Sequence, residues 1–170
     1  MLDPENFLIK ARSSNYHLWW LNFFMAKMIP FNRPHGFKVI KITEDLIRTM
    51  VPYKRANFNH IRGVHACALA TISEFTSGLA LINKLGFKKY RLIMQKMEMK
   101  YHYQAKENIV AEYIATNDWV ESQVIKPLES QDTVVVNCEI KTHDKQHNHI
   151  TTGNIYWQIK DWSKVKTKLE

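Results

Sequence analysis

The sequence is poor in glycine, proline and cysteine. Glycine and proline occur five times each in 170 residues, which excludes collagen-like and low-complexity chains. With 45% hydrophobic residues and no internal repeat, the chain is long enough to fold around one sizeable core. Its two cysteines, Cys67 and Cys138, are far apart and form no CxxC motif, so neither a disulfide framework nor a zinc knuckle is indicated. We therefore expect a globular protein in a reducing compartment, the cytoplasm.

The sequence is also short of acidic residues. It has 16 acidic against 24 basic side chains, which gives a formal net charge of +8. This balance favours an anionic partner such as nucleic acid, an anionic membrane or a phosphate-bearing small molecule. The basic residues are spread over the whole chain, so a nucleic acid is the least favoured of these partners.

Two long apolar segments stand out. Residues 16–31 are rich in Trp, Phe and Met, but they lack a small-residue cleavage site, and Asn22 and Lys27 interrupt them. We expect a helix over about 13–29 that is buried or docked on the surface, with a peripheral membrane helix as the alternative.

The second apolar segment is residues 64–83, in which Glu74 is the only formal charge. Small side chains recur along it at alternating spacings of four and three, which would let a sheet approach a helix closely: Ala66, Ala70, Ser73, Ser77 and Ala80. Glu74, His65 and four Ser or Thr residues make this segment a poor membrane span. We expect a helix that ends near Asn83, with Gly86 just beyond it.

Most of the remaining chain has the alternating pattern of β-strands. The expected strands are 37–43, 46–53, 90–103, 108–116, 133–142 and 151–160. In the third strand, one face is expected to carry Ile93, Gln95, Met97, Met99, Tyr101 and Tyr103. Runs of strands with segregated helices predict an α+β fold with an antiparallel sheet.

Glu74 is the residue with the clearest functional signal. Its neighbours at helical spacing are Cys67, Ala70, Gly78 and Leu81, none of which can pair with a carboxylate. Desolvation on such a surface should raise its pKa, and perturbed carboxyl groups are enriched at catalytic sites. The structural alternative is a buried glutamate that is hydrogen-bonded to Ser or Thr.

The order of elements and the entry to the long helix resemble hotdog-fold acyl-CoA thioesterases of the phenylacetyl-CoA type. In N59-H-I-R-G-V-H65, an Asn lies six residues before a His, and Glu74 follows nine residues after that His. The segment 57–86 also resembles a less characterised thioesterase-like branch. The resemblance implies a single domain over 1–170, in which a curved sheet of about six strands wraps a central helix. Residues 1–36 would be an N-terminal helical extension and residues 37–162 the hotdog core.

Helical geometry separates His65 from Glu74. Nine residues at about 100° each place the two side chains on opposite faces and more than two turns apart, so they cannot act together within one chain. In hotdog dimers the helix start of one subunit faces the acid of the other. The resemblance therefore implies a homodimer, with a tetramer as the larger alternative.

The resemblance implies the following roles in thioester hydrolysis. Glu74 would be the general base, or alternatively a nucleophile, and backbone amides around Val64, His65 and Ala66 would polarise the thioester carbonyl. Asn59 would orient water or substrate, and Gly63 would let the thioester approach the backbone. Lys88, Lys89 and Arg91 could hold coenzyme A phosphates. No cofactor or metal is implied.

This sequence departs from the family pattern at two places. Arg62 stands where a glycine is common, and Ala66 and Cys67 follow the His where glycines are common. A non-catalytic acyl-binding protein therefore stays open as an alternative, as does a hotdog hydratase or dehydratase. The nine-residue spacing argues against a hydratase or dehydratase.

Three other groups have simpler structural interpretations. Cys67 is expected to be a small core residue, not a thiol nucleophile. His143, His147 and His149 could bind a metal, but a solvated hairpin is favoured. A sheet core or an acyl-tunnel wall explains Tyr101, Tyr103, Trp157 and Trp162 more simply than base stacking.

Overall fold

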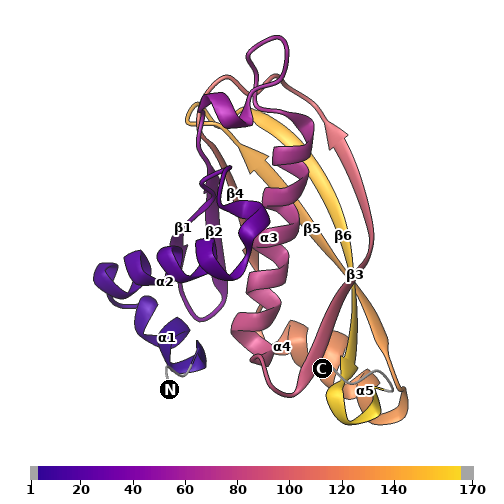
Figure 1. Ribbon diagram of the computed structural model, residues 1–170. Coiled ribbons are helices and arrows are strands. Elements are labelled where there is room, and N and C mark those ends of the chain that lie inside the picture. Colours follow the sequence, from indigo (N-terminus) through magenta and orange to yellow (C-terminus); the bar gives the residue numbers. More distant parts are fainter. Residues whose placement is uncertain (1–3, 166–170) are drawn as a thin grey trace.

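The computed structural model describes residues 4–165, which form an α+β fold. A six-stranded antiparallel sheet with the order β1-β2-β4-β5-β6-β3 curves around one long helix, α3 (Figure 1). The strands are β1 (Lys38–Ile42), β2 (Leu46–Val51), β3 (Tyr90–Tyr101), β4 (Ile109–Ile114), β5 (Val134–His143) and β6 (His149–Asp161). All six lie where the alternating pattern predicts them, and the arrangement is the expected hotdog fold.

Helix α3 (Ala66–Leu85) is the centre of the core. Its start is capped by the His65 ring, whose Nδ1 accepts a hydrogen bond of 3.1 Å from Cys67 N–H. It ends at Gly86, which has a φ of 73° that favours glycine. Its small polar side chains are buried against the sheet, where Thr49 and Thr76 share a hydrogen bond of 2.6 Å.

Within the described residues, α3 is the one helix whose length and hydropathy would suit a membrane span. However, 67% of its most apolar 18-residue window is buried inside the protein. Its apolar composition is accounted for by the core that it forms.

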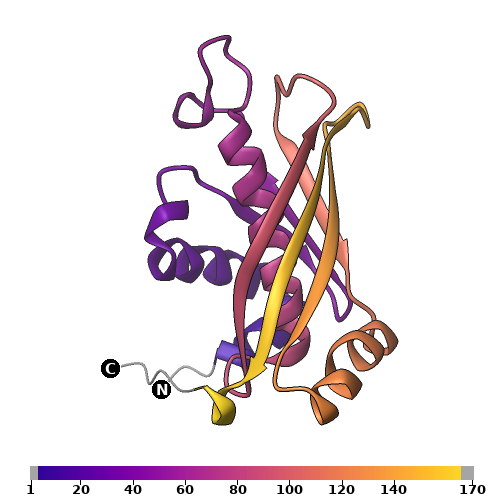
Figure 2. The same cartoon turned by 90° about the vertical axis from the view of Figure 1, so that its right-hand side faces the viewer.

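The N-terminal helices lie on the side of α3 that the sheet leaves open (Figure 2). They are α1 (Pro4–Ala11) and α2 (Asn15–Met28), and the short 3-10 helix η1 (Pro30–Asn32) follows them. Asn22 fixes α2 to the sheet edge, because its carboxamide accepts from Val39 N–H at 2.7 Å and donates to Val39 O at 2.9 Å. The expected docked helix is therefore confirmed, whereas α1 was not predicted.

One face of α2 stays uncovered in the described structure. Tyr16, Trp19 and Phe23 are exposed there, and Lys27 lies 4.7 Å from the Phe23 ring centroid. The opposite face packs Leu18, Leu21 and Met25 against the core.

Strand β3 forms one edge of the sheet and contains a β-bulge. Its pairing with β6 shifts register between Met94 and Lys96. The predicted uninterrupted alternation from Ile93 to Tyr103 is therefore wrong, because the bulge reverses the faces near Gln95. As a result, Met94 and Met97 both reach the same cavity beside α3.

The segment between β4 and β5 is helical, which the strand pattern did not predict. It consists of α4 (Asn117–Val120), a π-helical turn η3 (Glu121–Ile125) and α5 (Lys126–Ser130). Short 3-10 helices also occur at η2 (Arg55–Asn57) and η4 (Trp162–Lys164).

Candidate functional site

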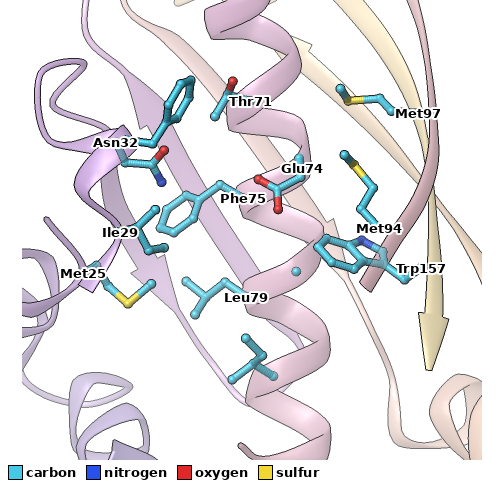
Figure 3. A pocket seen from close by; sticks show the side chains of 13 residues that line it. Met25, Ile29, Asn32, Thr71, Glu74, Phe75, Leu79, Met94, Met97 and Trp157 are labelled. Atoms are coloured by element: carbon cyan, nitrogen blue, oxygen red, sulfur yellow. The ribbon is translucent and has the colours of Figure 1, made fainter. Parts of the chain in front are cut away.

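A cavity of about 310 Å³ lies beside α3, between the N-terminal segment and strands β3 and β6. Figure 3 shows Met25, Ile29 and Asn32 of the N-terminal segment on one side of Glu74, and Met94, Met97 and Trp157 on the other. The full lining is Met25, Ile29, Phe31, Asn32, Thr71, Glu74, Phe75, Gly78, Leu79, Ile82, Met94, Met97 and Trp157. The cavity is thus almost wholly apolar, and Glu74 supplies its only charge.

The Glu74 carboxylate has no partner within the part of the chain that the structure describes, since it makes neither a hydrogen bond nor an ion pair there. The Ser77 hydroxyl, which could have paired with it, donates instead to the Glu74 main-chain oxygen at 3.0 Å. Burial without compensation raises the pKa of the Glu74 carboxyl group above its ordinary value.

Asn59 organises the loop that leads into α3. Its Oδ1 accepts hydrogen bonds from Ile61 N–H at 3.1 Å and from Gly63 N–H at 2.9 Å. A Cβ at Gly63 would lie 3.2 Å from Ala105 O, so a glycine suits this position because of packing. Arg62, at the place of the common glycine, adopts the left-handed conformation with a φ of 58°.

The amides at the start of α3 differ in availability. Val64 N–H donates to Ala105 O at 2.8 Å, and His65 N–H donates to Asn57 O at 2.7 Å. Cys67 N–H is taken by the His65 ring. Ala66 N–H makes no hydrogen bond to any described residue, so of the three predicted amides it is the one left free to polarise a carbonyl.

Ala66 and Glu74 of the same chain cannot share a substrate carbonyl. They are eight residues apart on one helix, which corresponds to about 12 Å along the axis. Asn59, Gly63 and His65 lie still farther along, before the helix begins. The structure therefore gathers these predicted residues at the helix entry and leaves Glu74 apart from them.

The three predicted phosphate-binding residues lie at the other end of α3. Lys88 and Lys89 are exposed, and Lys89 lies 5.0 Å from the Tyr90 ring centroid. Arg91 donates to Gln158 Oε1 at 3.3 Å and lines a second cavity of about 470 Å³. Ile82 lines both cavities, so this basic end adjoins the Glu74 cavity.

Two further candidates have no functional geometry. Cys67 is exposed, so the prediction of a core residue is wrong: it lies on the part of α3 that extends beyond the N-terminal helices. His143 stacks on His149, with ring centroids 5.3 Å apart. No cluster of three potential ligands that could hold a metal occurs in residues 4–165.

The sequence did not identify Asn32 as a site residue. Its side chain is only 8% exposed and lines the cavity beside Phe31. It lies in the stretch 30–36, whose Pro and Gly content indicates a loop. No local signal predicts its burial, because the burial depends on how the N-terminal segment docks onto α3.

Several solved structures share this fold. A protein of unknown function from Pseudomonas aeruginosa, described as a probable thioesterase, has a TM-score of 0.75 and 19% identity, covering 84% of this chain and 94% of its own. A thioesterase from Haemophilus influenzae has a TM-score of 0.65 and 11% identity, covering 89% and 95%. A thioesterase from Staphylococcus aureus has a TM-score of 0.60 and 16% identity, covering 77% and 98%. At these identities the likeness establishes the hotdog fold.

No curated protein matches the chain. Residues 18–159 match a family model described as a domain of unknown function, DUF4442. The matched region contains all but the first three residues of α2, all but the last two residues of the sheet, and the Glu74 cavity. Because the match spans most of the sequence, this protein belongs to the DUF4442 family.

Proposed function

We propose that this protein hydrolyses acyl thioesters and that Glu74 is its general base. The observation that carries the proposal is the lone Glu74 carboxylate, which is desolvated and has no partner among the described residues, in an almost wholly apolar cavity. Apolar walls suit an acyl chain, and a carboxylate with a raised pKa is a better base near neutral pH. Proteins that are named as thioesterases share the fold, which supports the same assignment.

The reaction needs one water and no cofactor. Glu74 takes a proton from the water as its oxygen bonds to the thioester carbon. The tetrahedral intermediate then collapses, the carbon–sulfur bond breaks, and the thiolate takes up the proton to leave as a free thiol. The free N–H of Ala66 suits the oxyanion, because it stands at the positive end of α3 and has no partner among the described residues.

A complete site requires a second copy of the chain, since Ala66 and Glu74 of one chain are too far apart. The edge strand β3 offers a surface for this homodimer, with Ile93 and Met94 exposed along it. Edge strands associate readily through their free main-chain groups.

In the dimer, Asn59 and Gly63 would support the Ala66 amide, while Lys88, Lys89 and Arg91 would hold the phosphates of coenzyme A.

The activity is tested by thiol release from acetyl-, hexanoyl-, phenylacetyl- and palmitoyl-CoA. Wild type should hydrolyse at least one of them, and Glu74→Gln should lower kcat by about 10²–10⁴-fold. Glu139→Gln, an exposed glutamate on β5, is the matched control and should keep wild-type activity. If Glu74→Gln is as active as wild type, the assignment of the base is wrong. Tight binding of acyl-CoA without turnover would instead support the non-catalytic alternative.

The dimer is tested by light scattering coupled to gel filtration. Wild type should elute as a dimer or a larger even oligomer, and Ile93→Glu on β3 should shift it toward the monomer and reduce thiol release. Val135→Glu, on the exposed face of β5, provides the control for an added charge. A wild-type protein that hydrolyses thioesters as a monodisperse monomer would contradict the shared site.

A further inference from the structure

We propose that Asn32 is a second catalytic residue, whose carboxamide holds the attacking water against Glu74. This inference rests on the proposed hydrolysis and adds a residue to its site. Figure 3 shows the Asn32 carboxamide on the N-terminal side of the cavity, directed toward the Glu74 carboxylate on α3. The N-terminal segment would then be part of the catalytic site as well as a cover for the helix.

Asn32 differs from the other inward-facing asparagines of this fold. Asn57 uses its carboxamide fully, donating to His35 O at 2.9 Å and Pro52 O at 2.8 Å and pairing with the His35 ring. Asn22 likewise donates to Leu18 O and Val39 O and accepts from Val39 N–H. The Asn32 carboxamide makes no hydrogen bond within residues 4–165, although the residue is 8% exposed. Because Asn32 lines the cavity, its unpaired carboxamide can bind a polar molecule that enters there.

The other polar side chains of the cavity already use their hydrogen-bond donors. Thr71 Oγ1 donates to Cys67 O at 2.8 Å, and Trp157 Nε1–H donates to Ser77 Oγ at 2.9 Å. Thr71 Oγ1 can still accept a hydrogen bond, but of the lining side chains only Asn32 and Glu74 have polar atoms that make no hydrogen bond at all to the described residues. A polar molecule that enters this apolar cavity has these two groups to bind.

A water molecule between Asn32 and Glu74 would be oriented for attack. The carboxylate can accept one hydrogen of the water and Asn32 Oδ1 the other, since both oxygens are acceptors. With both hydrogens bound, a lone pair points away from the two side chains, toward the acyl carbon. Glu74 then removes the water proton whose hydrogen bond it accepts.

The main chain holds Asn32 in place for this role. Its N–H donates to Ile29 O at 3.0 Å, and its carbonyl accepts from His35 N–H at 3.2 Å and Gly36 N–H at 3.1 Å. These bonds fix the backbone while the side chain stays unpaired. A fixed backbone reduces the loss of conformational freedom when water and substrate bind.

The principal test compares Asn32→Leu with wild type on the acyl-CoA that wild type hydrolyses best. We expect kcat to fall about 10–100-fold with little change in KM, because the water is held less well while the acyl chain binds as before. The midpoint of thermal unfolding should be unchanged or higher, because no hydrogen bond is lost. Asn137→Leu, the same change at an exposed asparagine of β5, should leave kcat as in wild type.

Two further variants separate this role from a structural one. In Asn32→Asp, a second carboxylate faces Glu74, so the acid limb of the pH profile should move to higher pH. Adding Asn32→Leu to Glu74→Gln should cost little more than Glu74→Gln alone, because both residues act on one water.

The outcomes distinguish this inference from the proposed function. If Glu74→Gln is inactive while Asn32→Leu keeps wild-type kcat, the role of Asn32 is overturned and the hydrolysis stands. A lower unfolding midpoint in Asn32→Leu together with an unmoved acid limb in Asn32→Asp would show a structural asparagine. If wild type releases no thiol from any thioester, both proposals fail together.

Discussion

The indole ring of Trp157 lies directly over Gly78 of α3. An ideal Cβ at Gly78 would be 2.9 Å from Cζ2 and 3.0 Å from Cη2 of this ring. The indole Nε1–H also donates a hydrogen bond of 2.9 Å to Ser77 Oγ on the same helix. Strand β6 and helix α3 therefore approach closely at the wall of the Glu74 cavity, and glycine is what permits this approach.

Gly78→Ala should destabilise the protein by about 1–3 kcal/mol through overpacking against Trp157. In an unconstrained helix the same change stabilises by about 1 kcal/mol, so the sign of the effect reports the contact. Denaturant unfolding measures the change. A Trp157→Phe background, which shortens the ring, should make Gly78→Ala less harmful. A stabilising Gly78→Ala in wild type would show that the indole moves aside freely.

The buried threonine pair that ties α3 to β2 should respond unequally to mutation. Thr76 Oγ1 donates to Ile72 O at 2.6 Å, so in the shared bond with Thr49 the hydroxyl of Thr49 is the donor. Thr76→Val would leave that donor unpaired at a residue with 0% exposure, at a cost of about 1–3 kcal/mol. Thr49→Val removes the donor itself and should cost less. Equal losses in urea unfolding would contradict this direction of donation.

Glu74→Gln should stabilise the protein at pH 7.5, although it is expected to lower kcat. Burial raises the pKa of Glu74 in the folded state above its ordinary value of 4.5. At any pH between the unfolded pKa and the raised folded pKa, the folded protein therefore binds more protons than the unfolded chain. The free energy of unfolding of wild type therefore falls as the pH rises through this window. Glutamine does not titrate, and its advantage should vanish below about pH 4.5. Thermal unfolding of both proteins from pH 4 to pH 8 measures the difference, and a constant difference would contradict a desolvated Glu74.

The sequence predicts the elements whose pattern is local. The strands follow from alternation, and α3 follows from a long apolar segment with Gly86 at its end. Two features were not predicted because they depend on contacts between segments that are far apart in the sequence. The bulge near Gln95 arises from the pairing of β3 with β6, and the burial of Asn32 arises from docking of the N-terminal segment onto α3. Neither contact leaves a periodic trace in the chain.

The residue types in the sequence identified candidate site residues. They did not show which of the candidate groups would be free of hydrogen bonds in the folded protein. The lone charge in an apolar segment was sufficient to identify Glu74. The amides of Val64 and His65 looked equivalent to that of Ala66 in the sequence, because their acceptors, Ala105 O and Asn57 O, come from other loops. Only the folded structure shows that, of these three amides, Ala66 N–H alone has no hydrogen-bond partner among residues 4–165.

Ala66→Pro tests this amide by removing a single N–H. Ala66 is the first residue of α3, a position where proline is well tolerated because its missing N–H has no partner in the helix. The preceding residue, His65, has φ −64° and ψ 141°, which is the extended conformation that proline requires before it. The helix should therefore form normally, with stability unchanged or raised by about 0.4–1 kcal/mol.

If the Ala66 amide stabilises the oxyanion, Ala66→Pro should lower kcat by about 10²–10³-fold, as the loss of one oxyanion donor does in other hydrolases. Ala66→Gly keeps the N–H and should stay close to wild-type kcat, which makes it the matched control. Circular dichroism and thermal unfolding confirm that α3 is intact in both variants. A folded Ala66→Pro protein with wild-type kcat would place the oxyanion donor elsewhere, since this protein lacks the Ala66 N–H.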